Sequence, residues 1–280
     1  MSSLPANIHM GYIGGVKIGG TPYFMSGSSI NPNQTVEAPD LVAGWEMRRG
    51  WTYGKVDVGG NVSGPLHEYA SSLWDTAFLR TTEKDHLAST VDIEIAFYQS
   101  GGWKFADCVI NSLQISATAG EVVQFTVDFA GKHPSAPAVA STDVPCSRLM
   151  TWDRCTFSTT VSGIAHLQSI NFTLNNNVQK LYAIQSVIDT TEGLYPVDLP
   201  CGVREITGSL SAYADGLISG INTGADAWGL YTAGAAAFVT FAVDPVMTFT
   251  FQSVFHRPTG SGQTGATIYS VGFTGVCGAS

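Results

Sequence analysis

Charged side chains are scarce in this chain of 280 residues, where they make up 12%, about half the fraction usual in soluble domains. Lys and Arg total 13 against 22 Asp and Glu, which gives a formal charge of −9. This balance excludes a general nucleic-acid-binding protein, because such proteins present a basic stripe to phosphates. A surface with so few charges is unusual for a free monomer. The composition therefore favours a chain that is covered by other subunits.

Long hydrophobic runs are also lacking. The longest apolar stretch, 233–243, has about 11 residues and is interrupted by Gly234 and Thr240, so it is too short to cross a bilayer. The first residues lack the basic region and apolar core of a secretion signal. We expect no membrane segment and a chain that folds in a cytoplasm.

Cysteine is infrequent, odd in number and never arranged as CxxC, which argues against a zinc site. Reduced and mostly buried thiols are the favoured interpretation, and a disulfide formed after release from a cell, within or between subunits, stays open. The five residues are Cys108, Cys146, Cys155, Cys201 and Cys277.

No set of residues forms a catalytic pattern. The six histidines include no H-x-H or H-x-x-x-H pair, so no metal site is predicted. Asp92 and Glu94 lie two apart and face one side of a predicted strand, where they could act as a glycosidase pair only with a partner from another strand. A solvated strand face is favoured instead. We expect no enzyme, no catalytic residue and no cofactor.

Alternating hydrophobic and polar residues dominate the chain and predict half-buried strands. Short turn signals between them predict hairpins, and hence antiparallel sheets. The clearest alternations have these inward residues: Val91, Ile93, Ile95 and Phe97; Val123, Phe125, Val127 and Phe129; Ile170, Phe172 and Leu174; Ile206, Leu210 and Ala212; Met247, Phe249 and Phe251.

Two segments depart from this period. The apolar residues of 65–79 have helical spacing, and a weaker helical pattern covers 217–231. Both halves of the chain therefore have one order: hairpin, loop, strand, helix, strand, hairpin. The first half has hairpins at 8–29 and 104–130 around a loop at 30–50, and the second has hairpins at 153–175 and 246–274 around a loop at 176–202.

We interpret this order as a tandem duplication. The predicted fold is mainly β, with two tandem antiparallel β-sandwich domains that each carry one flanking α-helix. The domains are 1–133 and 151–280, and 134–150, which is rich in proline and small residues, is the linker.

Aromatic and arginine residues gather in the first loop, where Trp45 and Trp51 flank Arg48 and Arg49. This composition is typical of subunit contacts, so we assign the loop to an interface. Tyr195 and Arg204, from the stretch 194–215, complete the predicted interface set. The tryptophans could instead line a sugar-binding groove.

Three stretches resemble bacteriophage tail tube proteins, also called major tail proteins: FADCVINSLQISATAGEVVQFTVDFAGK at 105–132, LQSINFTLNNNVQKLY at 167–182 and LYPVDLPCGVREITGSLSAYAD at 194–215. The resemblance implies tail-tube-like β-sandwich domains that assemble into stacked rings around a negatively lined channel. This channel delivers the genome into the host without binding DNA specifically. The loops 30–50 and 176–202 would reach the neighbouring ring.

Family rings usually hold six single domains, so two domains per chain imply a homotrimer with pseudo-sixfold symmetry, and a hexamer if the duplication is wrong. The implied location is the virion tail, assembled in the bacterial host cytoplasm. The implied partners are other tail proteins, such as tape measure, terminator, baseplate or sheath proteins. Two alternatives stay open: a distal tail or baseplate hub ring protein of related fold, and a carbohydrate- or receptor-binding β-sandwich module.

Overall fold

The computed structural model describes residues 14–37, 52–68, 70, 73, 77, 90–97, 101–135, 148–159, 167–183, 194–213, 236–256, 259–263 and 266–275. These residues form fifteen strands, all paired antiparallel, and one 3-10 helix, η1 (Trp152–Arg154). The mainly β, antiparallel class predicted from the alternation is therefore confirmed.

The strands of the first half are β1 (Gly14–Ile18), β2 (Thr21–Phe24), β3 (Gly27–Glu37), β4 (Thr52–Pro65), β5 (Val91–Phe97), β6 (Gly101–Thr118), β7 (Gln124–Ala130) and β8 (His133–Ser135). Those of the second half are β9 (Cys155–Thr159), β10 (Leu167–Asn175), β11 (Glu205–Tyr213), β12 (Ala236–Val243), β13 (Met247–Phe255), β14 (Thr259–Gln263) and β15 (Ala266–Gly275).

Strand β6 connects two sheets because it changes partners along its length. Its first part pairs with β5 up to Cys108, and its second part pairs with β7 from Val109 onward. Asp107, at the change, has a φ of 52°, a left-handed conformation that turns the strand. From Ser112 to Thr118, β6 also pairs with β10, so this strand joins the two halves of the chain.

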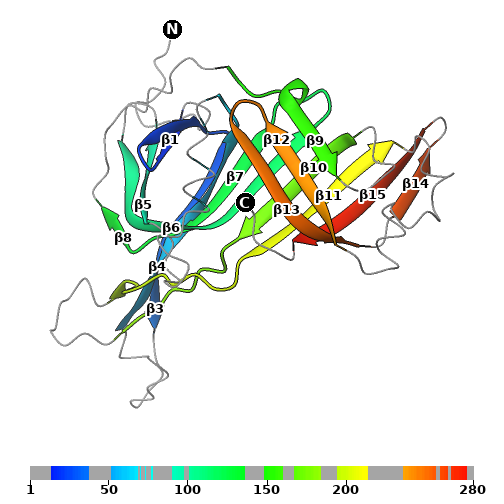
Figure 1. Cartoon of the computed structure of the whole chain (residues 1–280). Helices are drawn as coiled ribbons and strands as arrows, with labels where there is room; N and C mark the ends of the chain where they lie inside the picture. Colours follow the sequence, from blue (N-terminus) through cyan, green and yellow to red (C-terminus); the bar gives the residue numbers. More distant parts are fainter. Residues whose placement is uncertain are drawn as a thin grey trace, which may run out of the picture.

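A central sheet results, in which neighbouring strands follow the order β3-β4-β7-β6-β10-β11-β15-β14. The remaining strands fold over one face of it. In Figure 1 the hairpin of β12 and β13 crosses in front of β10 and β11. Phe172 of β10 accordingly contacts Phe241 of β12 and Phe249 of β13, with ring centroids 5.8 and 4.7 Å apart.

The first half has matching contacts between its sheets. Tyr23 of β2 contacts Phe125 of β7, and Phe105 of β6 contacts Phe129 of β7. Both sets of contacts belong to one continuous core. Two sheets that each carry one apolar face must bury those faces against each other, which is what these aromatic contacts achieve.

The two halves use the same order of strand pairing. In the first half the order is β1-β5-β6-β7-β4-β3, and in the second it is β9-β12-β13-β15-β11-β10. Matching members of the two series also follow one another in the same order along the sequence. Strand β14 pairs with the part of β15 that β13 does not reach. It thus takes the place that the second part of β6 takes beside β7 in the first half.

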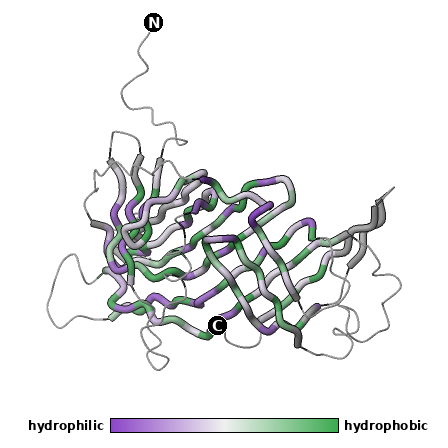
Figure 2. Tube along the Cα trace, turned by 45° about the horizontal axis from the view of Figure 1, so that its top comes forward, coloured by the Kyte–Doolittle hydropathy of each residue, from purple (hydrophilic) through white to green (hydrophobic). Residues whose placement is uncertain are grey.

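The predicted alternation is confirmed wherever the structure describes the side chains. Ile93, Ile95, Phe125, Val127 and Phe129 are buried, as are the inward residues predicted at 170–174, at 206–212 and at 247 and 249, while Val91 is half-buried. Figure 2 shows hydrophilic and hydrophobic residues alternating along the strands. The side chains of Phe97 and Phe251 lie outside the described residues.

Two expectations about connections were wrong. The predicted hairpin at 153–175 does not form, because β9 pairs with β12 and β10 pairs with β6 and β11. The predicted loop at 30–50 begins as strand, since β3 continues to Glu37 in a ladder with β4. Alternation predicts a strand but not its partner, which explains the first error. Residues 30–37, INPNQTVE, lack a regular alternation, which explains why this part of β3 was expected to be a loop.

The predicted helix at 217–231 lies outside the described residues. Of the segment 65–79, the structure describes 65–68, 70, 73 and 77, and Leu66, Ala70, Leu73 and Ala77 are fully or almost fully buried. Their spacing fits the apolar stripe of the prediction, and a helix here stays a prediction. The proposed linker 134–150 is described only at its ends, where Pro134 lies in β8 and Leu149 bridges to His67.

Candidate functional site

The open face of the central sheet carries mainly polar side chains at its described positions. Registered rows cross it from strand to strand. One row contains Asn61, Asp128, Ser112, Asn175 and Glu205. The next row contains Ser63, Thr126, Gln114, Thr173, Thr207 and Thr274.

This open face arises from the same alternation that builds the core. In β10, Ile170, Phe172 and Leu174 are buried, whereas Asn171 and Thr173 between them face outward and are partly exposed. The sequence places the polar residues on one side of each strand. The register then aligns these sides into one surface, and the sequence alone does not give that register.

From Gly59 of β4 across to β15, the few charges at strand positions of the open face are acidic. Asp128 and Glu205 lie at its strand positions, and none of the described outward positions of β4 from Gly59 onward, β6 from Ser112 onward, β7, β10, β11 or β15 is Lys or Arg. Ser, Thr, Asn and Gln make up most of the rest, with glycines such as Gly272, Pro65 at the end of β4, and Ala130, which the arm covers. This part of the surface is hydrated and its strand positions offer no fixed cation to a phosphate group. At its edge, Lys180 of the arm is paired with Asp57.

Side-chain hydrogen bonds between strands order this face. Gln114 Nε2 donates to Asn171 Oδ1 at 3.1 Å, and the hydroxyls of Ser211 and Ser270 are 3.0 Å apart. Asn111 Nδ2 donates to Asp128 Oδ2 at 2.8 Å. Because Asn111 occupies a bulge in the ladder of β6 with β7, its side chain is turned to the same side as Asp128.

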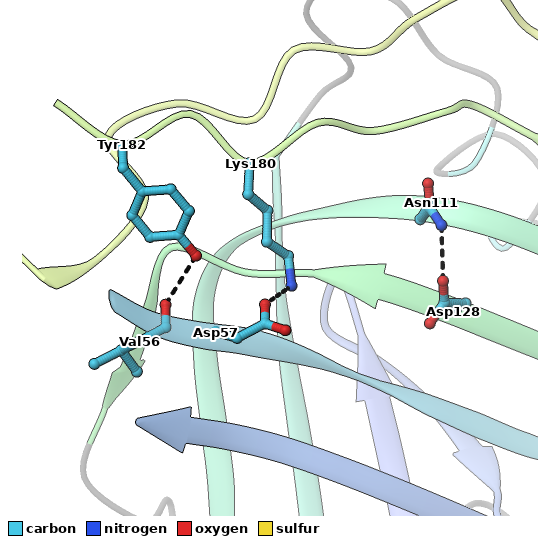
Figure 3. A network of polar contacts seen from close by, with 6 residues as sticks. All are labelled: Val56, Asp57, Asn111, Asp128, Lys180 and Tyr182. Carbon is cyan, nitrogen blue, oxygen red and sulfur yellow. Dashed lines mark hydrogen bonds and ion pairs between the residues drawn. The ribbon is translucent and has the colours of Figure 1, made fainter. Parts of the chain in front are cut away.

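A second feature, which we call the arm, comprises residues 176–183 and 194–204. Its two segments run antiparallel, with bridges between Val178 and Cys201 and between Leu181 and Asp198. Figure 3 shows how it contacts the sheet: Lys180 forms an ion pair with Asp57, and the Tyr182 hydroxyl donates to the carbonyl oxygen of Val56 at 3.1 Å. Burial, and then Asp57, raises the pKa of Tyr182.

Asn176 is buried and connects the base of the arm to the rest of the fold through hydrogen bonds. Its Nδ2 donates to the carbonyl oxygens of Ala77 and Ile110 at 3.0 and 2.9 Å. Its Oδ1 accepts from Arg204 Nε at 3.1 Å. The Asn175-Asn176-Asn177 run predicted a turn, and this role of Asn176 had no separate signal in the sequence.

Two members of the predicted interface set are described. Arg204 lies at the base of the arm, and the Tyr195 ring meets the His133 ring edge-on at 5.1 Å. Beside Arg204, Val203 is 79% exposed, and a single exposed apolar side chain of this kind is common on protein surfaces. Trp45, Arg48, Arg49 and Trp51 lie outside the described residues, so their assignment to an interface stays a prediction.

The acidic pair Asp92 and Glu94 faces a lysine rather than a carboxylate. Lys104 Nζ lies 2.9 Å from Asp92 Oδ2 and 3.4 Å from Glu94 Oε1, and the hydrogen bond that Lys104 donates to Asp92 raises the pKa of Lys104. This arrangement is a solvated strand face, as the alternation predicted. Among the residues that the structure describes, no cluster of His, Cys, Asp or Glu could hold a metal ion.

Three cysteines are described, and all are free thiols: Cys108, Cys155 and Cys201. Burial raises the pKa of Cys108 strongly and raises that of Cys155 to about 11, so neither is a ready nucleophile at neutral pH. Cys146 and Cys277 lie outside the described residues. In the described part of the chain, no helix has the length and apolarity needed to cross a membrane.

Comparison with known families gives one match, to the model described as phage tail tube protein, over residues 6–275. Comparison with curated proteins gave no match. The family match covers nearly the whole chain, including both halves and the arm. This chain therefore belongs to the phage tail tube protein family, whose members have a structural, non-enzymatic role in the viral tail.

Proposed function

We propose that copies of this chain form closed rings that stack into a hollow tube, and that the open face of the central sheet lines the channel. The observation that carries this proposal is the polarity of that face. It holds Asp128 and Glu205 and has no Lys or Arg at the described strand positions from Gly59 of β4 across to β15. Lys55 of β4 and Lys180 of the arm lie beyond this region, where they contact Tyr182 and Asp57.

The physical argument concerns the passage of DNA. Nonspecific binding of DNA comes mainly from Lys and Arg on phosphates. A hydrated wall of Ser, Thr, Asn and Gln with a slight excess of carboxylates repels the backbone, so the genome slides through it. The opposite face of the sheet is apolar and covered by the other sheets, so only the open face is available for a channel.

We further propose that each ring is a homotrimer of two-domain chains with pseudo-sixfold symmetry. The matching order of strand pairing in the two halves supports the duplication, with domains 1–133 and 151–280. Assembly would take place in the bacterial host cytoplasm, and the ends and outside of the tube would meet tape measure, terminator, baseplate or sheath proteins.

Negative-stain microscopy of the purified protein tests this function. Stacked rings or hollow tubes are expected. Single rings that never stack would favour a distal tail or baseplate hub role. A strictly monomeric protein at high concentration would contradict the proposal, and a monomer that binds sugars would favour the carbohydrate-binding alternative.

A further inference from the structure

Two strands of the central sheet are paired on one side only within the described part of the chain. Strand β3 pairs with β4, and β14 pairs with β15. These two strands are the opposite ends of the sheet order given above. The free edge of each strand presents unpaired N–H and C=O groups, which readily pair with another chain.

The two halves can be aligned residue by residue through their ladders. Strands β4 and β7 pair over seven positions, from Gly59↔Ala130 to Pro65↔Gln124. Strands β11 and β15 also pair over seven, from Thr207↔Thr274 to Tyr213↔Ile268. Aligning these ladders end to end matches Gly60 with Gly208.

An independent packing detail supports this alignment. A Cβ added to Gly60 would lie 2.8 Å from the carbonyl oxygen of Ser29 and 3.1 Å from the ring of Phe129. A Cβ added to Gly208 would lie 2.6 Å from the carbonyl oxygen of Asn171 and would overlap the ring of Phe273. A glycine, a phenylalanine and a neighbouring carbonyl thus recur together in the two halves.

The alignment also fixes two further correspondences. Ser29 pairs with Asn61 as Asn171 pairs with Ser209, so Ser29 corresponds to Asn171. Likewise, Ser116 of β6 pairs with Gln124 as Ser261 of β14 pairs with Ile268, so Ser116 corresponds to Ser261.

Within the chain, the strands that contain Asn171 and Ser116 are directly paired. This ladder of β10 with β6 is the one that joins the two halves, and Asn171 lies opposite Ser116 in it. Replacing each residue by its counterpart gives a ladder of β3 with β14, with Ser29 opposite Ser261. No such ladder exists within one chain, because β3 and β14 are at opposite ends of the sheet.

We infer that β3 of one copy pairs antiparallel with β14 of the next copy, with Gly27 opposite Gln263, Ser29 opposite Ser261 and Asn31 opposite Thr259. The partner is a second copy of this chain, and the inference rests on the proposed ring. This contact between two chains has the same geometry as the ladder that β6 and β10 form within one chain.

The sequence of the two edges fits this pairing. The ladder spans five residues on each strand and uses all of β14. On β3 it ends just before Pro32, which has no N–H to donate. Ser28 and Ser29 are exposed and offer little apolar surface, so main-chain hydrogen bonds would provide most of the contact, as in other strand additions. A ring closed in this way leaves the central sheet without a free edge.

Cysteine cross-linking tests the register. The double variant Ser29→Cys/Ser261→Cys places two thiols opposite each other on neighbouring copies, within the Cα separation that a disulfide needs. After mild oxidation of assembled tubes, a non-reducing gel should show covalent dimers and trimers and nothing larger. The matched control, Ser29→Cys/Thr259→Cys, displaces one thiol by two residues and should cross-link at least tenfold less.

Three results would overturn the inference: tubes of the first variant that stay monomeric on the gel, equal cross-linking in both variants, or cross-linking equal to that of the unchanged chain with its five native cysteines. If a double variant does not assemble, mixed tubes of Ser29→Cys and Ser261→Cys chains should give dimers only, and their absence would overturn it too. Absence of tubes from the unchanged chain would instead contradict the proposed function, so the two failures are distinguishable.

Discussion

The ring of Phe273 covers Gly208 so closely that a methyl group at Gly208 would overlap it. Gly208 lies in β11 and Phe273 in the neighbouring strand β15, opposite each other in the ladder. The glycine therefore supplies the space that the ring needs to lie flat on the sheet, and the same relationship holds between Gly60 and Phe129.

Gly208→Ala and Gly60→Ala should each destabilise the fold. The added methyl must displace a ring or a backbone carbonyl, and overpacking of this kind costs about 1–3 kcal/mol. Thermal or urea unfolding of the two variants measures the loss. Gly272→Ala is the matched control in the same sheet, because its Cβ would have nearest neighbours at 3.6 Å, so it should be close to neutral. Equal effects at Gly208 and Gly272 would contradict the packing argument.

The buried junction at Asn176 should be sensitive to truncation. Asn176→Ala removes both hydrogen bonds from its amide and leaves the carbonyls of Ala77 and Ile110 without this donor. The expected loss is about 1–3 kcal/mol of unfolding free energy. The exposed neighbour Gln179 gives the control Gln179→Ala, which should change stability by less than about 0.5 kcal/mol. A similar loss of unfolding free energy in both variants would show that the buried amide of Asn176 is not the cause.

Acid should destabilise the fold through His67. This buried side chain donates from Nε2 to the carbonyl oxygen of Pro22 at 3.1 Å. Burial lowers its pKa below the ordinary value of 6.5, although the Pro22 hydrogen bond and the charge of Glu68 oppose that shift.

The unfolded chain therefore takes up this proton at a higher pH than the folded chain. Stability from this group is fully present well above pH 6.5 and decreases as the pH falls below it, by at most about 1.4 kcal/mol per pH unit. Unfolding free energies at pH 7.5 and 5.5 measure the slope. His67→Gln cannot titrate, so its slope over this interval should be smaller, and an unchanged slope would exclude His67 as the cause.

Adding cations to the proposed channel wall should make it retain DNA. Ser209→Lys places a lysine at the centre of the open face, whereas Thr248→Lys places one on the exposed side of β13, outside that face. Tubes of the first variant should bind short duplex DNA that enters the bore, and binding should fall steeply as salt is raised. Tubes of the unchanged chain and of Thr248→Lys should not bind. Equal binding by both lysine variants would contradict a channel on the open face.

The strands and their inward faces could be predicted from the sequence because alternation is a local pattern. For residues such as Phe125 and Phe172, the alternation with the neighbouring polar residues predicts which face of the sheet they lie on. The partners of β9, β10 and β3 could not be predicted, because pairing depends on contacts between residues far apart in sequence. Asn171 was visible as an outward residue, but only the pairing of β10 with β6 and β11 places it within a continuous polar face.

The candidate interface divides in the same way. The composition around Trp45 and Arg48 predicts an interface from the sequence, but these residues lie outside the described part of the chain. The free edges of β3 and β14 have no distinctive composition, so their pairing could not be predicted from the sequence. It follows only from the matched ladders of the two halves. The ion pair of Lys180 with Asp57 likewise joins residues more than a hundred positions apart.

In the proposed ring, three chains close on one another by repeating between copies the strand pairing found within each copy. An averaged end-on electron micrograph of the tube tests it most directly. The expected image is a ring of six similar lobes with threefold symmetry, and the expected mass is that of three chains per ring. A ring of six whole chains, or a protein that forms no ring, would contradict it.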